Sequence, residues 1–243
     1  LAKASCMGIN CMIEPQNPFA NKELTTEERI VLRAEREANI EAEKNGGIPT
    51  KHSLIKLRKA YDDAGNDFKA AETLEQQNEI YPNPEDYNLI GVYYHNSGNK
   101  DKAVEFFERA IEHNPNDYWP NFNLGNTLFY KDPQRARKHL NKAYELYPSE
   151  PCINILLGRL DKNEGKTVEA KEKFQIAYDK YEQRWKANSL SDTDYDWFAS
   201  VAEELGKRDK AYEIRRAKPK IEKTSYYDEE NLTQTILKSI TKI

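Results

Sequence analysis

The chain has 243 residues, and its 37 Lys and Arg residues against 41 Asp and Glu residues leave a formal net charge of −4. This balance argues against a dedicated nucleic-acid-binding protein, which usually carries a basic surplus. No apolar run reaches the roughly 18–20 residues that a membrane-spanning helix needs. With only 10 Gly and 11 Pro, the composition favours a soluble helical chain over a β-sandwich or a disordered one.

The first 24 residues are predicted to form an extended linker, interrupted by Pro15 and Pro18. They show no charged and then apolar leader, so no signal peptide is recognisable. Cys6 and Cys11 share this segment and would pair in an oxidising compartment, which would leave Cys152 odd. Because no zinc-type ligand spacing surrounds the three cysteines, unpaired thiols are favoured. The compartment stays open, with an intracellular one favoured.

A helix is predicted over residues 25–46. Thr25 and Glu28 form a capping box, in which each side chain satisfies a free backbone N–H of the first helical turn. The helix is expected to end before Gly46 and Gly47, because glycine adopts the left-handed conformation that terminates helices. Its Arg- and Glu-rich sequence favours a solvated cap over the following repeat, and an interaction arm is the alternative.

A repeat of 33 or 34 residues follows. Alanines recur at this spacing, and each is followed four residues later by a large apolar side chain. The alanines are Ala70, Ala103, Ala136 and Ala170, and the large residues are Leu74, Phe107, Leu140 and Phe174. Residues three or four apart share one face of a helix, so each set predicts a helix that packs closely through its small residues.

A further helix is predicted before each alanine. The pairs Ile90-Gly91, Leu124-Gly125 and Leu157-Gly158 mark it, the turn glycines are Gly65, Gly98 and Gly165, and the closing prolines are Pro82, Pro115 and Pro148. Glycine suits a left-handed helix end, and proline stops a helix because it lacks the N–H donor. A helix–turn–helix unit of this kind cannot bury its apolar face alone, so the units must stack.

This spacing resembles the tetratricopeptide repeat family, whose pattern places W/Y, L, G and Y on the first helix and A, F, A and P on the second. The best copy is Tyr87, Ile90, Gly91, Tyr94, Ala103, Phe107, Ala110 and Pro115. The resemblance covers about residues 51–218. It implies an all-α, right-handed superhelical solenoid of helix–turn–helix repeats, a fold that binds partners and has no particular chemistry.

The expected repeats depart from the pattern at their ends. They span about 51–83, 84–116, 117–150, 151–186 and 193–218. The first carries Arg58 at the glycine position. The fourth has no terminal proline, so its second helix is expected to run on through Tyr181 and Trp185. In the fifth, Arg215 stands where the large apolar residue belongs.

A last helix is predicted at 226–243, with Asp228 as its cap. Its apolar stripe consists of Leu232, Ile236, Ile240 and Ile243. Residues at this spacing lie on one helical face, so the helix is expected to cap the last repeat at its apolar face. The alternative is that this apolar stripe binds a partner protein.

No catalytic or cofactor-binding pattern is found in the sequence. The four histidines are dispersed, and phosphate-binding, nucleophile-elbow and dinucleotide-binding glycine motifs are missing. Asp192, Asp194 and Asp196 alternate, but the Gly and distal Glu of a calcium loop do not follow, so they are expected to lead into a helix starting near Thr193. We therefore predict that the chain is not an enzyme and has no cofactor and no metal site.

The resemblance also implies which residues face a partner, because in this family the first helix of each repeat lines a concave groove. The positions are His52, Ile55, Lys59, Asp62, Glu85, Asn88, Val92, His95, Trp119, Phe122, Asn126, Phe129, Tyr130, Cys152, Ile155, Arg159 and Lys162. Some chaperone-binding members hold a C-terminal carboxylate with a clamp of Lys, Asn, Asn, Lys and Arg. The corresponding positions of this chain do not carry that set of residues, so binding of an Hsp70- or Hsp90-type C-terminal tail is not expected.

An aromatic cluster stands out in the third repeat. Trp119, Phe122, Phe129 and Tyr130 recur at helical spacing around Asn126. They are either core residues or a partly exposed aromatic groove, the composition of a binding hot spot. Asn126, with Arg159 and Lys162 of the next repeat, is expected to bind peptide carbonyls or an acidic side chain.

The sequence thus predicts a non-catalytic scaffold or adaptor that binds a peptide or protein segment, of unknown identity, in the groove. The alternative is a regulatory or substrate-presenting module of a larger enzyme whose catalytic domain precedes Leu1, since the chain does not begin with Met. A third possibility is recognition of a nucleic acid or polysaccharide through stacked aromatic rings, against which the acidic balance argues for nucleic acid.

Overall fold

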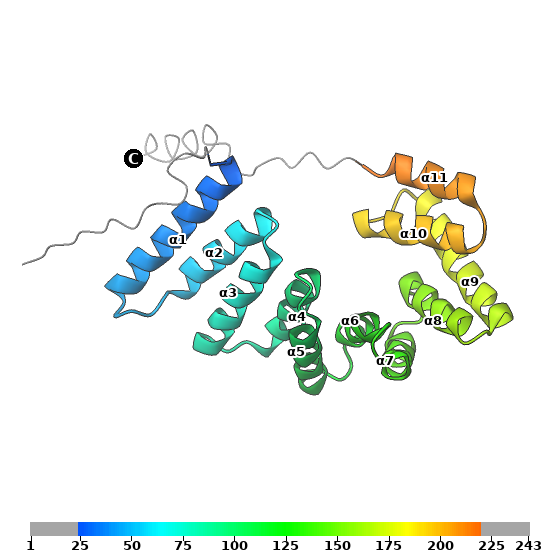
Figure 1. Ribbon diagram of the computed structural model, residues 1–243, viewed down its shortest axis with the longest axis horizontal. Helices are drawn as coiled ribbons and strands as arrows, with labels where there is room; N and C mark the ends of the chain where they lie inside the picture. The colour runs from blue at the N-terminus through cyan, green and yellow to red at the C-terminus, as the bar shows by residue number, and fades with distance from the viewer. Residues whose placement is uncertain (1–23, 220–243) are drawn as a thin grey trace, which may run out of the picture. The chain divides into compact units, whose positions relative to one another are not determined.

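The computed structural model describes residues 24–219, and all regular secondary structure within that range is helical (Figure 1). The chain divides into two compact units, one up to Leu146 and one from Tyr147. Residues 1–23 of the expected linker, with Cys6 and Cys11, and the expected helix at 226–243 lie outside the described residues. Within residues 24–219, no helix is both long and apolar enough to cross a lipid bilayer.

The first unit is a series of helical hairpins. Its elements are α1 (Thr26–Lys44), α2 (Lys51–Asp63), α3 (Asp67–Ile80), the short 3-10 helix η1 (Pro84–Asp86), α4 (Tyr87–Asn96), α5 (Lys100–His113), α6 (Tyr118–Leu128) and α7 (Pro133–Leu146). α2 pairs with α3, α4 with α5 and α6 with α7, while α1 packs on α2, α4 on α3 and α6 on α5. The predicted helix–turn–helix repeats are therefore confirmed in this unit.

The second unit contains the two remaining hairpins. Its elements are α8 (Pro151–Asn163), α9 (Thr167–Lys186), α10 (Asp192–Glu204) and α11 (Arg208–Ala217). α9 runs through Tyr181 and Trp185, as the missing proline predicts. α10 begins at Asp192, where Ser191 and Asp194 form a capping box. The aspartates of this segment thus start a helix.

The helix ends follow the predicted signals. Thr25 and Glu28 form the expected capping box at the start of α1. Gly65, Gly98 and Gly165 have φ values of +69°, +85° and +78°, the left-handed region that only glycine enters without strain. These glycines turn the chain between the two helices of their hairpins.

Close packing inside three hairpins depends on a glycine in the first helix. A Cβ atom on Gly91, Gly125 or Gly158 would lie only 2.6–2.7 Å from the Phe107, Leu140 or Phe174 side chain. Contacts that short do not occur between carbon atoms, so the large residue occupies the space that a methyl group would need. In the fifth hairpin, Ile214 is the buried residue and the neighbouring Arg215 is exposed.

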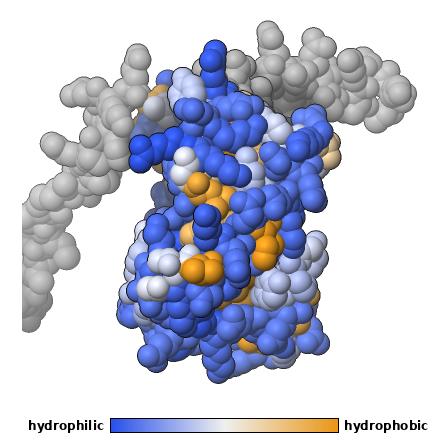
Figure 2. Space-filling model, turned by 90° about the vertical axis from the view of Figure 1, so that its right-hand side faces the viewer, coloured by the Kyte–Doolittle hydropathy of each residue, from blue (hydrophilic) through white to orange (hydrophobic). Residues whose placement is uncertain are grey.

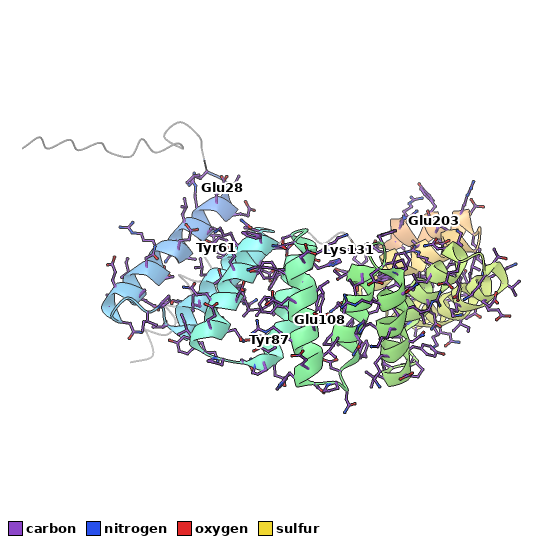
Figure 3. The ribbon with its side chains drawn as sticks, turned by 60° about the horizontal axis from the view of Figure 1, so that its bottom comes forward. Glu28, Tyr61, Tyr87, Glu108, Lys131 and Glu203 are labelled. Carbon is purple, nitrogen blue, oxygen red and sulfur yellow. The ribbon has the colours of Figure 1, made fainter. Side chains whose placement is uncertain are left out.

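Two buried tyrosines link first helices of hairpins to the helix that precedes each of them, through hydrogen bonds. The hydroxyl of Tyr61 in α2 donates to Glu35 of α1 (Figure 3). Tyr94, at the equivalent position of α4, donates to Glu75 of α3, and Lys102 lies 2.9 Å from the same carboxylate. Burial, with the Glu75 hydrogen bond, raises the pKa of Tyr94 to about 12, so its hydroxyl keeps its proton at neutral pH.

Candidate interaction surface

The exposed face of α6 carries the first part of the candidate surface. Asp117 caps the helix by accepting the Trp119 backbone N–H at 3.0 Å. At 3.6 residues per turn, Trp119, Asn126 and Tyr130 point in nearly the same direction. Phe129 keeps a right-handed helical backbone, which continues this alignment to Tyr130. Trp119 is 46% exposed and Tyr130 is 85% exposed.

The other two aromatic residues of the cluster are buried. Phe122 and Phe129 retain only 6% and 5% of their exposure, so the expectation of an exposed groove is wrong for these two side chains. Phe122 meets Trp119 edge to face at a ring distance of 6.2 Å, and Phe129 meets Tyr130 at 5.0 Å. Each exposed ring therefore rests against a buried one, which limits its motion.

Polar side chains join α6 to α4 on the neighbouring side of this face. The Asn123 amide donates to the Asn88 side-chain oxygen at 3.0 Å. His95 Nδ1 lies 2.9 Å from the Thr127 hydroxyl, which itself donates to the Asn123 carbonyl at 2.7 Å. The predicted residues Asn88 and His95 thus lie beside α6, in contact with Asn123 and Thr127.

The hydrogen-bond pattern decides the tautomer of His95. The Thr127 hydroxyl gives its hydrogen to the Asn123 carbonyl, so it accepts the hydrogen of His95 Nδ1. Nε2 of the neutral ring is then an acceptor. Burial, together with the nearby charge of Lys100, lowers the pKa of His95, so the ring is neutral at pH 7.

Asn126 differs from these residues because its amide is unoccupied. Its side chain is half-buried, and it makes no hydrogen bond with any part of the chain that the structure describes. An amide offers both a carbonyl acceptor and two N–H donors. It is therefore free to bond with the backbone of another chain.

The charged residues near this surface are paired. Lys131, next to Tyr130, lies 2.6 Å from Asp101, and Arg135 pairs with Glu108 in the same region (Figure 3). In η1, just before α4, Glu85 lies 3.3 Å from His113. The α4–α6 surface, defined here as Asn88, His95, Trp119, Asn126 and Tyr130, therefore presents aromatic rings and amides and carries little net charge.

The predicted cations of the second unit are already occupied. Arg159 Nε and Lys162 Nζ lie 3.0 and 2.9 Å from the two oxygens of Glu204, and Arg159 also bonds to Ser200. Burial acts to raise the pKa of Glu204, but the hydrogen bonds of Lys162 and Arg159 outweigh it and hold the pKa below its usual value. These contacts join α8 to α10.

Two further positions expected in the groove are buried. Cys152 is 5% exposed and Ile155 is fully buried in the core of the second unit, so the expectation that they face a partner is wrong. Burial, with the neighbouring Glu150 charge, raises the pKa of the Cys152 thiol well above its usual range. A thiol of this kind is unreactive, because the thiolate is the nucleophile.

The residues that form hydrogen bonds with the predicted site residues were not identified from the sequence. Asn123 and Thr127 are polar residues four apart on a largely buried helix, a signal for side chains that bond to a neighbour. Glu204 and Ser200 stand 45 and 41 residues from Arg159, and the sequence holds no comparable signal for them. Among the described residues, no group of three His, Cys, Asp or Glu side chains is placed to hold a metal ion.

The comparisons with known proteins agree with this architecture. The tetratricopeptide repeat family model matches residues 84–117. A crystal structure of MamA is 20% identical, with 68% of this chain and 99% of that chain covered and a TM-score of 0.54. A MamA fragment from Desulfovibrio magneticus RS-1 is 17% identical, covers 68% and 91% and has a TM-score of 0.50.

These similarities define the class of the protein. The repeat at residues 84–117 coincides with η1, α4 and α5, the hairpin that fits the repeat pattern best. The resemblance to the tetratricopeptide repeat family is confirmed, and the chain shares its repeat fold with MamA. At these identities, the likeness to MamA is one of fold.

Proposed function

We propose that the chain is a non-catalytic scaffold that binds an extended peptide segment of a partner protein on its α4–α6 surface. The tetratricopeptide fold supports a protein-interaction scaffold in general. The observation that carries the specific proposal is the exposed row of Trp119, Asn126 and Tyr130. Two aromatic rings flank an unoccupied amide there, and both rings rest on buried ones.

Such a row suits the energetics of peptide binding. Large aromatic side chains dominate interface energies, and a ring that is already held in place loses little entropy on binding. Trp119 and Tyr130 are 11 residues apart, which corresponds to about 16 Å along a helix. An extended peptide covers that distance with about five residues, so two apolar side chains of the partner would reach the two rings.

The polar groups between the rings match a peptide backbone. The amide of Asn126 would accept a backbone N–H and donate to a backbone carbonyl. Nε2 of neutral His95 would accept a second N–H, since its Nδ1 is committed to Thr127. Because the surrounding charges are paired, we expect the bound segment to be apolar and uncharged, unlike a C-terminal carboxylate tail.

Arg159 and Lys162 enter the proposal in a different way. Both would have to exchange Glu204 for an acidic group of the partner, and this exchange gains little because one charge-assisted contact replaces another. We therefore assign the main binding energy to the α4–α6 surface. Arg159 and Lys162 stay paired with Glu204 when the peptide binds.

Selection of peptides from a random displayed library would test the proposal. The full chain is expected to enrich peptides with two large apolar residues, and the W119A/Y130A variant is expected to bind them at least about tenfold more weakly. The matched control is Y144A/Y212A, which removes two exposed tyrosines from α7 and α11, the second helices of their hairpins. Circular dichroism melts of both variants should match the wild type.

Two results would contradict this function. The first is that the library yields no binding peptide above background. The second is that the control variant loses as much affinity as W119A/Y130A, which would place the binding site elsewhere.

A further inference from the structure

A cavity lies at the far end of the second unit. Its volume is about 330 Å³, and its lining residues are Trp185, Asn188, Leu190, Tyr195 and Ala217. Trp185 and Tyr195 meet edge to face at 5.9 Å and pack against the buried core of α9–α11. The surface seen from this side is mainly hydrophilic, with a few small hydrophobic patches (Figure 2).

The chain itself leaves from this cavity. Ala217 is both the last residue of α11 and one of the lining residues. At about 3.4 Å per residue, the nine residues 219–227 reach roughly 30 Å, so the segment beyond them can return to the cavity. A short tether of this kind gives an effective concentration in the millimolar range, which favours docking within one chain over docking between two.

The apolar stripe after the tether is in register with the repeats. Leu232 and Ile236 follow Phe198 and Ala202 by 34 residues, the spacing that also separates Ile90 from Leu124. Phe198 and Ala202 are fully buried in α10. Leu232 and Ile236 thus hold the positions that a further first helix would bury.

The charges of the two segments are complementary. Residues 208–218 contain five basic and two acidic side chains, while residues 226–232 contain three acidic and no basic ones. Lys210, Arg215 and Lys218 are paired with Glu213, Glu203 and Asp196, so Arg208 and Arg216 are the basic groups of residues 208–218 that make no ion pair among the described residues. An acidic segment would be attracted to this side of α11.

We propose that residues 228–243 of this same chain dock as a helix on the cavity lined by Trp185, Leu190 and Tyr195. Ile236 and Ile240 fill the cavity from the apolar face of the helix. Asp228 and its acidic neighbours approach the basic side of α11. The aromatic end of the second unit is then closed by the chain's own tail, and it is not a site for a separate partner.

Hydrogen exchange of the full chain, read by mass spectrometry, would test this docking. The variant I236D/I240D places two charges on the stripe, and Q234D/T241D places the same two charges on the opposite helical face. We expect the amides of residues 185–197 to exchange roughly tenfold faster in I236D/I240D than in the wild type and in Q234D/T241D. The amides of α4–α6 serve as the internal reference and should not change.

Three results would overturn the proposal. One is equal exchange of residues 185–197 in the wild type and I236D/I240D. Another is an equal effect of the control variant, which would indicate added charge and not loss of docking. The third is protection that disappears when the protein is diluted, because this would show that the tail of a second copy occupies the cavity.

Discussion

The helices α6 and α8 hold equivalent positions in neighbouring repeats but use them differently. Cys152, Arg159 and Lys162 of α8 follow Trp119, Asn126 and Phe129 of α6 by 33 residues. On α6, the row of Trp119, Asn126 and Tyr130 leaves two rings exposed and one amide unoccupied. On α8, the thiol is buried and both cations are held by α10.

The difference shows that a residue's position in the repeat determines the helical face on which it lies. It does not determine whether the side chain bonds within the chain or is available to a partner. Arg159 contributes to the structure because α10 supplies Glu204 and Ser200 at the right place. Asn126 is available because no neighbour within the described chain reaches its amide. A binding surface in a repeat protein is therefore found by asking which side chains of a face lack internal partners.

The largest expected change in stability comes from replacing the packed glycine of each helix, Gly125 in α6 and Gly158 in α8. A methyl group on Gly125 would meet Leu140, and one on Gly158 would meet Phe174. Overpacking costs typically 1–3 kcal/mol, which exceeds the gain of about 1 kcal/mol in helix propensity from Gly to Ala. We expect G125A and G158A each to lower the free energy of unfolding, by up to about 2 kcal/mol, in urea titrations.

The two glycine variants should differ in their effect on binding. G125A shifts α6 against α7 and is expected to weaken peptide binding, whereas G158A leaves α6 untouched and should bind as the wild type does. Equal loss of peptide affinity in both variants would show that the two helices form one surface, which would break the comparison.

The equivalent residues Asn126 of α6 and Arg159 of α8 can be exchanged, as N126R and R159N, to test whether the two helices differ in role. R159N leaves Glu204, which is only 17% exposed, with a single cation, and we expect a loss of about 1 kcal/mol of stability. N126R adds a charge to an exposed face, so it should change stability by less than about 0.5 kcal/mol. It should also weaken binding of an apolar peptide roughly tenfold, because the charge must be desolvated.

Thermal melts and peptide titrations of both variants would measure these effects. A stable R159N protein with weakened peptide binding would assign Arg159 to the partner surface. That result would contradict the structural role given to it here.

The repeated elements could be predicted from sequence because their causes are local. Small residues such as Gly91 are required by direct contact, and Gly98 by its left-handed backbone, so both leave a regular spacing. The capping box of Thr25 and Glu28 is likewise contained in four residues. The helices, their turns and their pairing therefore followed from the pattern.

The candidate surface could be predicted only in part, because exposure depends on distant neighbours. Trp119 and Phe122 share a helix and an aromatic character, yet one is 46% exposed and the other 6%. The two side chains lie only about 60° apart around α6, so the periodicity alone does not say which of them a neighbour covers. Arg215 and Ile214 show the same limit, since the spacing pointed to position 215 and the helix buries position 214.

The smallest expected effect concerns pH and again separates the two units. All four histidines lie before residue 147, so the second unit has none. Burial lowers the pKa of His95, with Lys100 adding to it, and burial with Lys138 and Arg135 lowers the pKa of His139. Both rings are therefore protonated more readily in the unfolded chain, where the pKa is about 6.5.

The sign of the effect follows from this difference. Above about pH 7, both states hold neutral histidines and the first unit has its full stability. As the pH falls through about 6.5 towards the lower folded pKa, the unfolded chain binds more protons and the first unit loses stability, by an amount we expect to be below about 1 kcal/mol. H95Q/H139Q should show a smaller loss than the wild type in melts from about pH 7.5 to 5.5. Exchange rates corrected for pH should change in α4–α7 and not in α8–α11, and an equal change in both units would assign the effect to carboxylates instead.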